Sequence, residues 1–153
     1  MTRNPEASMK LIVAAVIERE DRRLLIGQRE RNDTSPLKWE FPGGKVEEGE
    51  TPEVALAREV WEETGATMTQ CMEIGRVNHK YPDRAEELEI RFFAAAILET
   101  EVKPLTFEEV RWVLPRELSE YDFLAANAPL VAQLATGRIK PREILEAVNP
   151  DKQ

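Results

Sequence analysis

The chain has 153 residues and a formal net charge of −8 at pH 7, and 33% of its residues are charged. This length fits one domain, and the acidic balance excludes a general affinity for polymeric nucleic acid. No apolar run approaches membrane-spanning length, residues 1–8 do not resemble a secretory leader, and the single cysteine, Cys71, excludes an internal disulfide. We therefore expect a cytoplasmic protein with no membrane partner, which is a monomer or a weak homodimer.

The first half of the chain predicts two strands and a loop after a loose tail at residues 1–8. Apolar runs of strand length and a turn signal between them indicate a hairpin. The expected order is a strand at 10–18, a turn at Glu20-Asp21, the hairpin partner at 22–29, a polar loop at 30–38, and residues 39–42 leading into a tight turn at Gly43-Gly44.

The clearest helix is predicted at residues 52–64. Thr51 is a good N-cap, Pro52 suits the first helical position, and Gly65 can end the helix in a left-handed conformation. These three residues define both ends of the helix.

The second half mixes strands with further helices, which predicts an α/β (α+β) fold with a mixed sheet between helices. We expect one domain over residues 9–137 and a C-terminal extension at 138–153. The expected elements are strands at 68–79 and 88–98 with a turn at 81–83, a short strand at 110–114, a helix at 128–135 and a short terminal helix at 139–148.

Three glutamates share one face of the first helix. Glu62 and Glu63 are three and four positions after Glu59, so both side chains are its neighbours on the helix. A glutamate-rich helix face is ordinarily just solvated. Three clustered carboxylates nevertheless repel one another unless a cation lies among them, and Arg58 alone cannot neutralise all three. The opposite side of the helix, which we expect to face the core, carries Val54, Ala57 and Trp61.

The glycine pair before this helix strengthens the case for a metal site. Gly43 and Gly44 allow the backbone to turn tightly and to bring carbonyl oxygens close to a ligand. Mg²⁺ prefers oxygen ligands and shares them with substrate phosphates, so an acidic protein can bind a polyphosphate through the cation. The two features together predict a Mg²⁺ site that takes a phosphate-bearing ligand.

Residues 44–66 resemble the Nudix box, the motif of hydrolases that act on nucleoside diphosphates linked to another group. Every fixed position matches, and only the closing position, Ala66, departs from the usual larger aliphatic residue. The resemblance implies the Nudix fold, an α/β/α sandwich. The matching residues are Gly44, Glu50, Arg58-Glu59-Val60, Glu62-Glu63 and Gly65.

The resemblance also implies roles for these residues. The three glutamates would bind Mg²⁺ or Mn²⁺ and activate water, with Glu59 favoured as general base and the carbonyl of Gly43 completing the metal site. Arg58 would orient Glu59, and Glu50 would hold the loop and the arginine, with Gly44 and Gly65 structural. One histidine and one cysteine make a nucleophilic triad an unsuitable alternative.

The flanking segments resemble MutT-like nucleoside triphosphate pyrophosphohydrolases. Residues 39–45 (WEFPGGK) precede the box as in that group, Tyr81-Pro82-Asp83-Arg84 resembles its turn before a strand, and Asn127 resembles the residue that reads the purine edge. Asn127 could instead cap the following helix. The candidates for substrate binding are Arg29, Phe41, Tyr81, Arg84 and Asn127, although Arg29 could be a solvated strand end and Phe41 a core residue.

The acidic pair Glu108-Glu109 lies before the strand at 110–114. Many Nudix enzymes supply a further metal ligand from such a loop, so Glu109 is our preferred candidate for that role. An acidic surface pair is an equally good interpretation, and either Glu108 or Glu109 fits the loop.

Three functions follow from the resemblance. The first is hydrolysis of (deoxy)nucleoside triphosphates, including oxidised ones such as 8-oxo-dGTP, to the monophosphate and pyrophosphate. The second is a Nudix hydrolase of ADP-ribose, a dinucleoside polyphosphate or a pyrimidine triphosphate. The third is a non-catalytic nucleotide sensor, which the intact set of box carboxylates disfavours.

Overall fold

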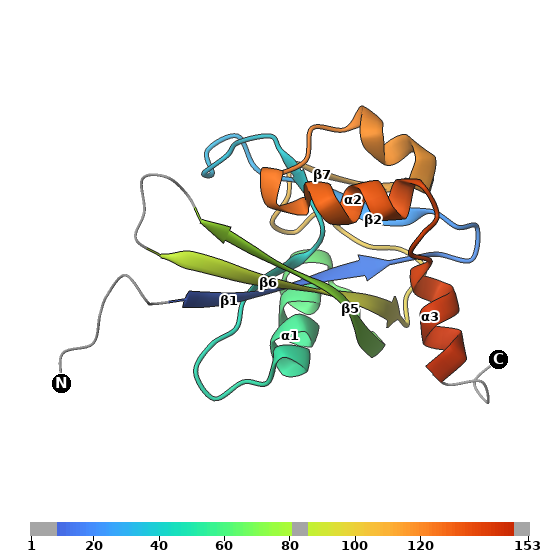
Figure 1. The fold of residues 1–153 in the computed structure, drawn as a ribbon, viewed down its shortest axis with the longest axis horizontal. Helices are drawn as coiled ribbons and strands as arrows, with labels where there is room; N and C mark the ends of the chain where they lie inside the picture. Colours follow the sequence, from blue (N-terminus) through green and yellow to red (C-terminus); the bar gives the residue numbers. More distant parts are fainter. Residues whose placement is uncertain (1–8, 81–85, 149–153) are drawn as a thin grey trace.

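The computed structural model describes residues 9–80 and 86–148, and within them two sheets and three α-helices are arranged as layers (Figure 1). The larger sheet has the strand order β4-β1-β6-β5 and is mixed, because β1 and β6 run parallel while the other pairs are antiparallel. Its strands are β1 (Met9–Ile17), β4 (Gly43–Lys45), β5 (Met68–Lys80) and β6 (Glu87–Ile97).

The smaller sheet is antiparallel and has the order β3-β2-β7. Its strands are β2 (Leu24–Gln28), β3 (Trp39–Glu40) and β7 (Glu109–Val113). The predicted hairpin between the first two strands is therefore wrong, since β1 and β2 share only the isolated bridge from Glu18 to Leu24. Both faces of β1 are buried, and its two edges are taken by β4 and β6, so β2 turns away into the other sheet.

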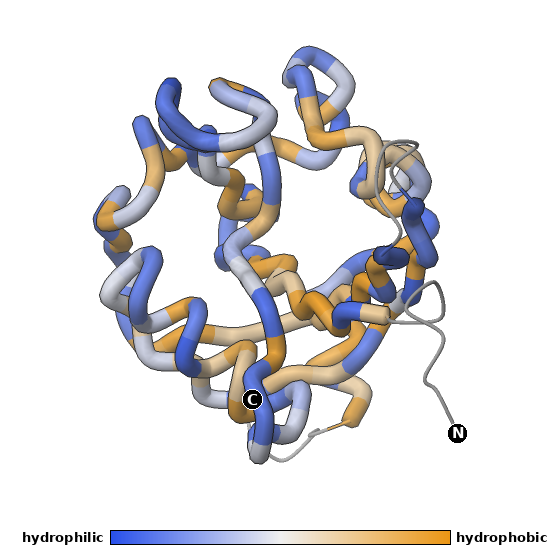
Figure 2. The backbone as a smooth tube through the Cα atoms, turned by 90° about the vertical axis from the view of Figure 1, so that its left-hand side faces the viewer, coloured by the Kyte–Doolittle hydropathy of each residue, from blue (hydrophilic) through white to orange (hydrophobic). Residues whose placement is uncertain are grey.

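Helices cover both faces of the larger sheet, which confirms the predicted α/β/α arrangement. Helix α1 (Pro52–Thr64) packs on one face, where Ala55, Leu56 and Val60 join the core with alternate residues of β1. Helix α2 (Ala128–Ala135) packs in the other cluster through Leu130 and Leu134. Figure 2 shows hydrophobic stretches along the interior strands and hydrophilic ones along many outer loops.

The two ends of α1 follow the expected capping. The Thr51 hydroxyl accepts a hydrogen bond from Val54 N at 3.1 Å, and Gly65, at φ 74°, donates to Trp61 O at 2.9 Å. The expected core face is wrong, however, because Trp61 and Val54 are 59% and 55% exposed. The helix rests on the sheet through Leu56 and Val60, so the carboxylate face lies beside the core and not opposite to it.

The C-terminal segment adds a helix, α3 (Pro141–Val148), that packs against β6 and β5. Glu18 accepts a hydrogen bond from Arg142 N at 3.0 Å, and Leu145 is buried. None of the helices in the two described ranges is long and apolar enough to cross a membrane. The turn expected at 81–83 lies outside the described residues.

Candidate active site

The glycine pair brings the turn, the sheet and helix α1 into close contact. A side chain on Gly43 would place its Cβ 2.0 Å from Val13 O, because β4 pairs tightly with β1 here. At Gly44 a Cβ would lie 2.5 Å from the carboxyl carbon of Glu59. The backbone of β1 therefore requires glycine at position 43, whereas a side chain at position 44 would displace the carboxylate of Glu59.

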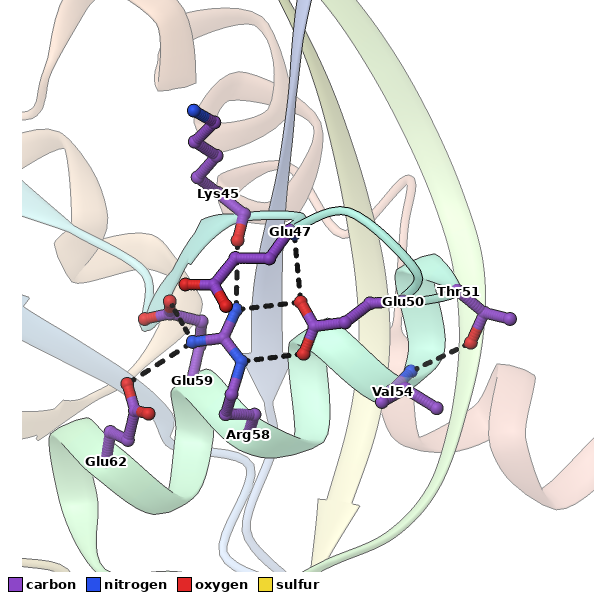
Figure 3. A network of polar contacts seen from close by, with 8 residues as sticks. All are labelled: Lys45, Glu47, Glu50, Thr51, Val54, Arg58, Glu59 and Glu62. Carbon is purple, nitrogen blue, oxygen red and sulfur yellow. Dashed lines mark hydrogen bonds and ion pairs between the residues drawn. The ribbon is translucent and has the colours of Figure 1, made fainter.

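Arg58 organises the carboxylates at the start of the site (Figure 3). It donates two hydrogen bonds to Glu50, from Nε at 2.7 Å and from Nη2 at 2.9 Å. Nη1 donates to Glu59 at 2.8 Å and to Glu62 at 3.3 Å, and Nη2 also donates to Lys45 O at 3.0 Å. The hydrogen bonds from Arg58 lower the pKa of Glu50 to about 2, so this pair remains ionised at neutral pH. Arg58 thus ties Glu59 to the loop that precedes the helix.

Glu63 is held on the other side of the glutamate face. Its Oε1 accepts a hydrogen bond from Gly43 N at 3.0 Å. Burial, together with the charges of Glu40 and Glu59, raises the pKa of Glu63 to about 9, although the bond from Gly43 works against the shift. The neighbouring charges that raise this pKa are negative, and a divalent cation bound here would supply the compensating positive charge.

A cavity of about 410 Å³ lies over these groups. Its wall combines the carboxylates of α1 with apolar residues of the larger sheet and residues of the segments around β2 and β3. A larger groove of about 950 Å³ runs beside α3 and carries none of the motif residues, so the smaller cavity is the candidate site. The smaller cavity is lined by Gly43, Gly44, Glu59, Glu62, Glu63, Arg29, Glu30, Asp33, Glu40, Phe41, Ile12, Val13, Ala14, Leu88, Ile90, Thr106, Phe107 and Asn127.

The donor atoms around this cavity suit a hard divalent cation. Glu59, Glu62 and Glu63 supply carboxylate oxygens from one helix face, and Gly43 brings backbone to the same wall. No group of three acidic, histidine or cysteine side chains in the described ranges is arranged to hold a metal as it stands. Glu59 and Glu62 accept hydrogen bonds from Arg58, and Glu63 accepts one from Gly43 N. Cation binding would require these side chains to exchange those partners.

Three of the expected substrate-binding residues meet in the cavity. Arg29, Phe41 and Asn127 all line it, although they come from separate segments of the chain. Asn127 is 6% exposed, and its side chain makes no capping hydrogen bond to α2. The structure therefore does not support the capping interpretation. Phe41 is buried and packs edge-on against Phe92 with ring centroids 6.4 Å apart, so it belongs to both the core and the wall. Tyr81 and Arg84 lie outside the described residues.

The acidic pair after β6 does not reach the cavity wall. Glu109 lies on β7 and pairs with Arg111 at 2.8 Å. Glu108 accepts a hydrogen bond from Arg31 N at 3.1 Å and so ties together the loops that precede β3 and β7. Neither residue is among those that line the cavity with the other candidate metal ligands.

Glu40 and Phe107 are among the wall residues that were not expected from the sequence. Glu40 lies on β3 between the buried residues Trp39 and Phe41, and a charged residue between two aromatic ones was the available signal. Phe107 is 6% exposed and packs its ring on Gly27, where an added Cβ would lie 2.6 Å from the ring. No sequence pattern indicated that contact, which joins residues far apart along the chain.

Comparison with known proteins gives the family. A family model described as NUDIX domain matches residues 9–134. The chain is 32% identical over 123 residues to the 8-oxo-dGTP diphosphatase of Escherichia coli K12, covering 80% of this chain and 94% of that protein. It is 47% identical over 73 residues to the 8-oxo-dGTP diphosphatase of Proteus vulgaris, covering 48% of this chain and 65% of that protein. It is 30% identical over 125 residues to the CTP pyrophosphohydrolase of E. coli K12, covering 80% and 90%.

Solved structures agree with this result. The MutT protein of Methanosarcina mazei Go1 has a TM-score of 0.74 and 27% identity, and the match covers 87% of this chain and 97% of that one. A MutT protein from a study of Aliivibrio salmonicida and Vibrio cholerae has a TM-score of 0.70 and 29% identity, with coverage of 85% and 99%. The chain belongs to the NUDIX family. Within it, the chain falls in the MutT-like branch and is a hydrolase of phosphoric anhydride bonds, a class that generally needs a divalent metal ion.

Proposed function

We propose that this enzyme is a Mg²⁺-dependent pyrophosphohydrolase that converts (deoxy)nucleoside triphosphates, oxidised guanine nucleotides among them, to the monophosphate and pyrophosphate. The single observation that carries the proposal is one cavity that combines the box glutamates with Arg29, Phe41 and Asn127. One group of these side chains suits phosphates and a cation, and the other suits a base. The 8-oxo-dGTP diphosphatases among its relatives support the same substrate class.

The three carboxylates of α1 have different proposed roles in the reaction. Bound Mg²⁺ would neutralise phosphate oxygens and lower the pKa of a water molecule. Glu59 takes the proton of the attacking water, since Arg58 holds its carboxylate beside the backbone of Gly44. Glu62 and Glu63, with the carbonyl of Gly43, are the proposed ligands of the cation, and Mn²⁺ could replace Mg²⁺ because both accept oxygen donors.

The remaining cavity residues orient the nucleotide. Arg29, whose side chain is 17% exposed, offers its charge to the phosphates. Asn127 can both donate to and accept from a base edge, and its burial allows it to do so without competition from water. Phe41 supplies an apolar wall. We propose that the enzyme acts on free nucleotides in the cytoplasm, as a monomer or weak homodimer.

A product assay tests this proposal. The purified protein is incubated with Mg²⁺ and, separately, dGTP, 8-oxo-dGTP, CTP and ADP-ribose, and the products are resolved by chromatography. We expect monophosphate and pyrophosphate from the guanine triphosphates and no turnover after exhaustive chelation. Release of orthophosphate from a triphosphate, cleavage of ADP-ribose alone, or turnover that survives chelation would each contradict the proposal.

A second candidate substrate is a pyrimidine triphosphate, favoured by the similarity to a CTP pyrophosphohydrolase. The cavity residues apart from Asn127 would serve either base equally well, since they face phosphates or form apolar wall. The ratio of kcat/KM for CTP to that for 8-oxo-dGTP separates the two candidates in the same assay.

A further inference from the structure

Glu40 is a carboxylate in the cavity wall that lies outside the Nudix box. It is on β3, where it pairs with Gly27 of β2, and its side chain is 22% exposed. It lines the same cavity as Glu59, Glu62 and Glu63, which come from α1. The strand therefore brings a further negative charge to the carboxylates of the helix.

Its partner is Arg29, at the end of β2. Arg29 Nη1 donates to Glu40 Oε1 at 3.1 Å. The other groups of the guanidinium are held by the loop at residues 30–37: Nε donates to Thr34 O at 2.7 Å, and Nη2 contacts Thr34 Oγ1 at 2.9 Å and Asp33 at 3.1 Å. Arg29 is thus fixed between this loop and Glu40.

The proposed metal ligands Glu62 and Glu63 line the same cavity as Arg29. Glu40 and Glu63 both line this cavity of about 410 Å³, so the strand and the helix each contribute a carboxylate to the same enclosed space. Without Glu40, Arg29 keeps its bonds to the loop, but its Nη1 loses its charged acceptor and would be attracted to Glu62 and Glu63 in the same cavity. It would then compete with a divalent cation for the same oxygens.

We propose that Glu40 is a positioning residue that holds Arg29 away from the helix carboxylates and so keeps them open to the divalent cation. The inference rests on the metal site of the proposed function. It concerns cation binding without nucleotide, so it can be tested whether or not the substrate is the expected one.

The test measures Mn²⁺ binding to the full chain from the electron paramagnetic resonance signal of free Mn²⁺. Glu40→Gln keeps the shape but removes the charge, and we expect its Mn²⁺ affinity to fall about tenfold, as for other residues that orient metal ligands. Glu40→Asp keeps the charge but is one methylene shorter, so it should lose affinity as well. In Glu40→Gln/Arg29→Met no arginine can compete and the net charge equals that of wild type. The affinity should therefore return to within about threefold of wild type, since removing an ion pair as a whole has a small effect.

Glu48→Gln is the control, since it removes one carboxylate charge at an exposed residue that does not line the cavity. We expect it to leave Mn²⁺ affinity near wild type, and thermal melting of each variant verifies folding. If the double variant binds as weakly as Glu40→Gln, Glu40 is itself a ligand and the proposal is wrong. The proposal is equally wrong if Glu48→Gln weakens Mn²⁺ binding as much as Glu40→Gln, because the effect would then come from net charge alone. It is also wrong if both Glu40 variants bind Mn²⁺ like wild type.

Discussion

Alanine substitutions at the adjacent residues Gly43 and Gly44 each add one methyl group, and we expect one to lower stability and the other to lower activity. In Gly44→Ala the added Cβ would lie 2.5 Å from the carboxyl carbon of Glu59 and 2.6–2.7 Å from its oxygens, where ordinary contact begins at 3.4 Å. The carboxylate must therefore shift by about 1 Å, and a misplacement of that size costs roughly 10²-fold in rate. The fold should tolerate the change within about 1 kcal/mol, because the clash is with a flexible side chain and alanine restricts the unfolded chain.

Gly43→Ala is the matched comparison, since it adds the same atom one residue earlier. There the Cβ would lie 2.0 Å from Val13 O, which is backbone that cannot rotate away. We expect β4 to separate from β1 and the free energy of unfolding to fall by about 3 kcal/mol, the upper range for overpacking. Urea unfolding and kcat/KM are measured for both variants. Full activity in Gly44→Ala, or a stability loss as large as that of Gly43→Ala, would refute the placement of Glu59 against the turn.

Three further predictions concern single side chains. Glu59→Gln should lower kcat at least about 10²-fold, as for a general base, whereas Glu48→Gln outside the cavity should be nearly silent in the same assay. Asn127→Ala should cost about 1–3 kcal/mol in kcat/KM for the preferred nucleotide and little for poor ones; an unchanged substrate ranking would contradict base recognition. Glu63 has a raised pKa of about 9 against the ordinary value of 4.5, so the folded chain binds the proton more tightly. Its contribution to stability without metal should therefore be fully present below about pH 4.5 and be lost as pH rises towards 9, and Glu63→Gln should flatten that part of the melting profile.

The local chemistry of the motif was predictable because it depends on neighbours along the chain. Thr51 and Gly65 define the ends of α1 through hydrogen bonds within one turn, and Glu59 and Glu62 share a face through the helical repeat. The family resemblance then supplied roles for these residues that spacing alone does not contain.

Pairing between distant segments was decided only by the tertiary structure. Apolar patterning marked both β1 and β2 as strands, but it does not say which strand occupies each edge, and the expected hairpin was wrong. The same periodicity assigned Trp61 to the core, whereas contact with the sheet is made through Leu56 and Val60. A helical pattern gives angles around the axis, and only the position of the sheet determines which angle is buried.

The cavity also combines residues that the sequence made visible with contacts that only the tertiary structure decided. Glu40 was visible in the sequence beside the glycine turn, yet its relation to Arg29 and Glu63 arises because β3 pairs with β2 while α1 packs on the other sheet. Glu109, which we expect at the metal site from its loop, pairs with Arg111 on β7, a contact that the sequence did not indicate. Motif spacing determined which carboxylates of the helix lie together at the cavity. The surroundings of these carboxylates were determined by how the two sheets pack. This packing brings together charges that are far apart in the chain.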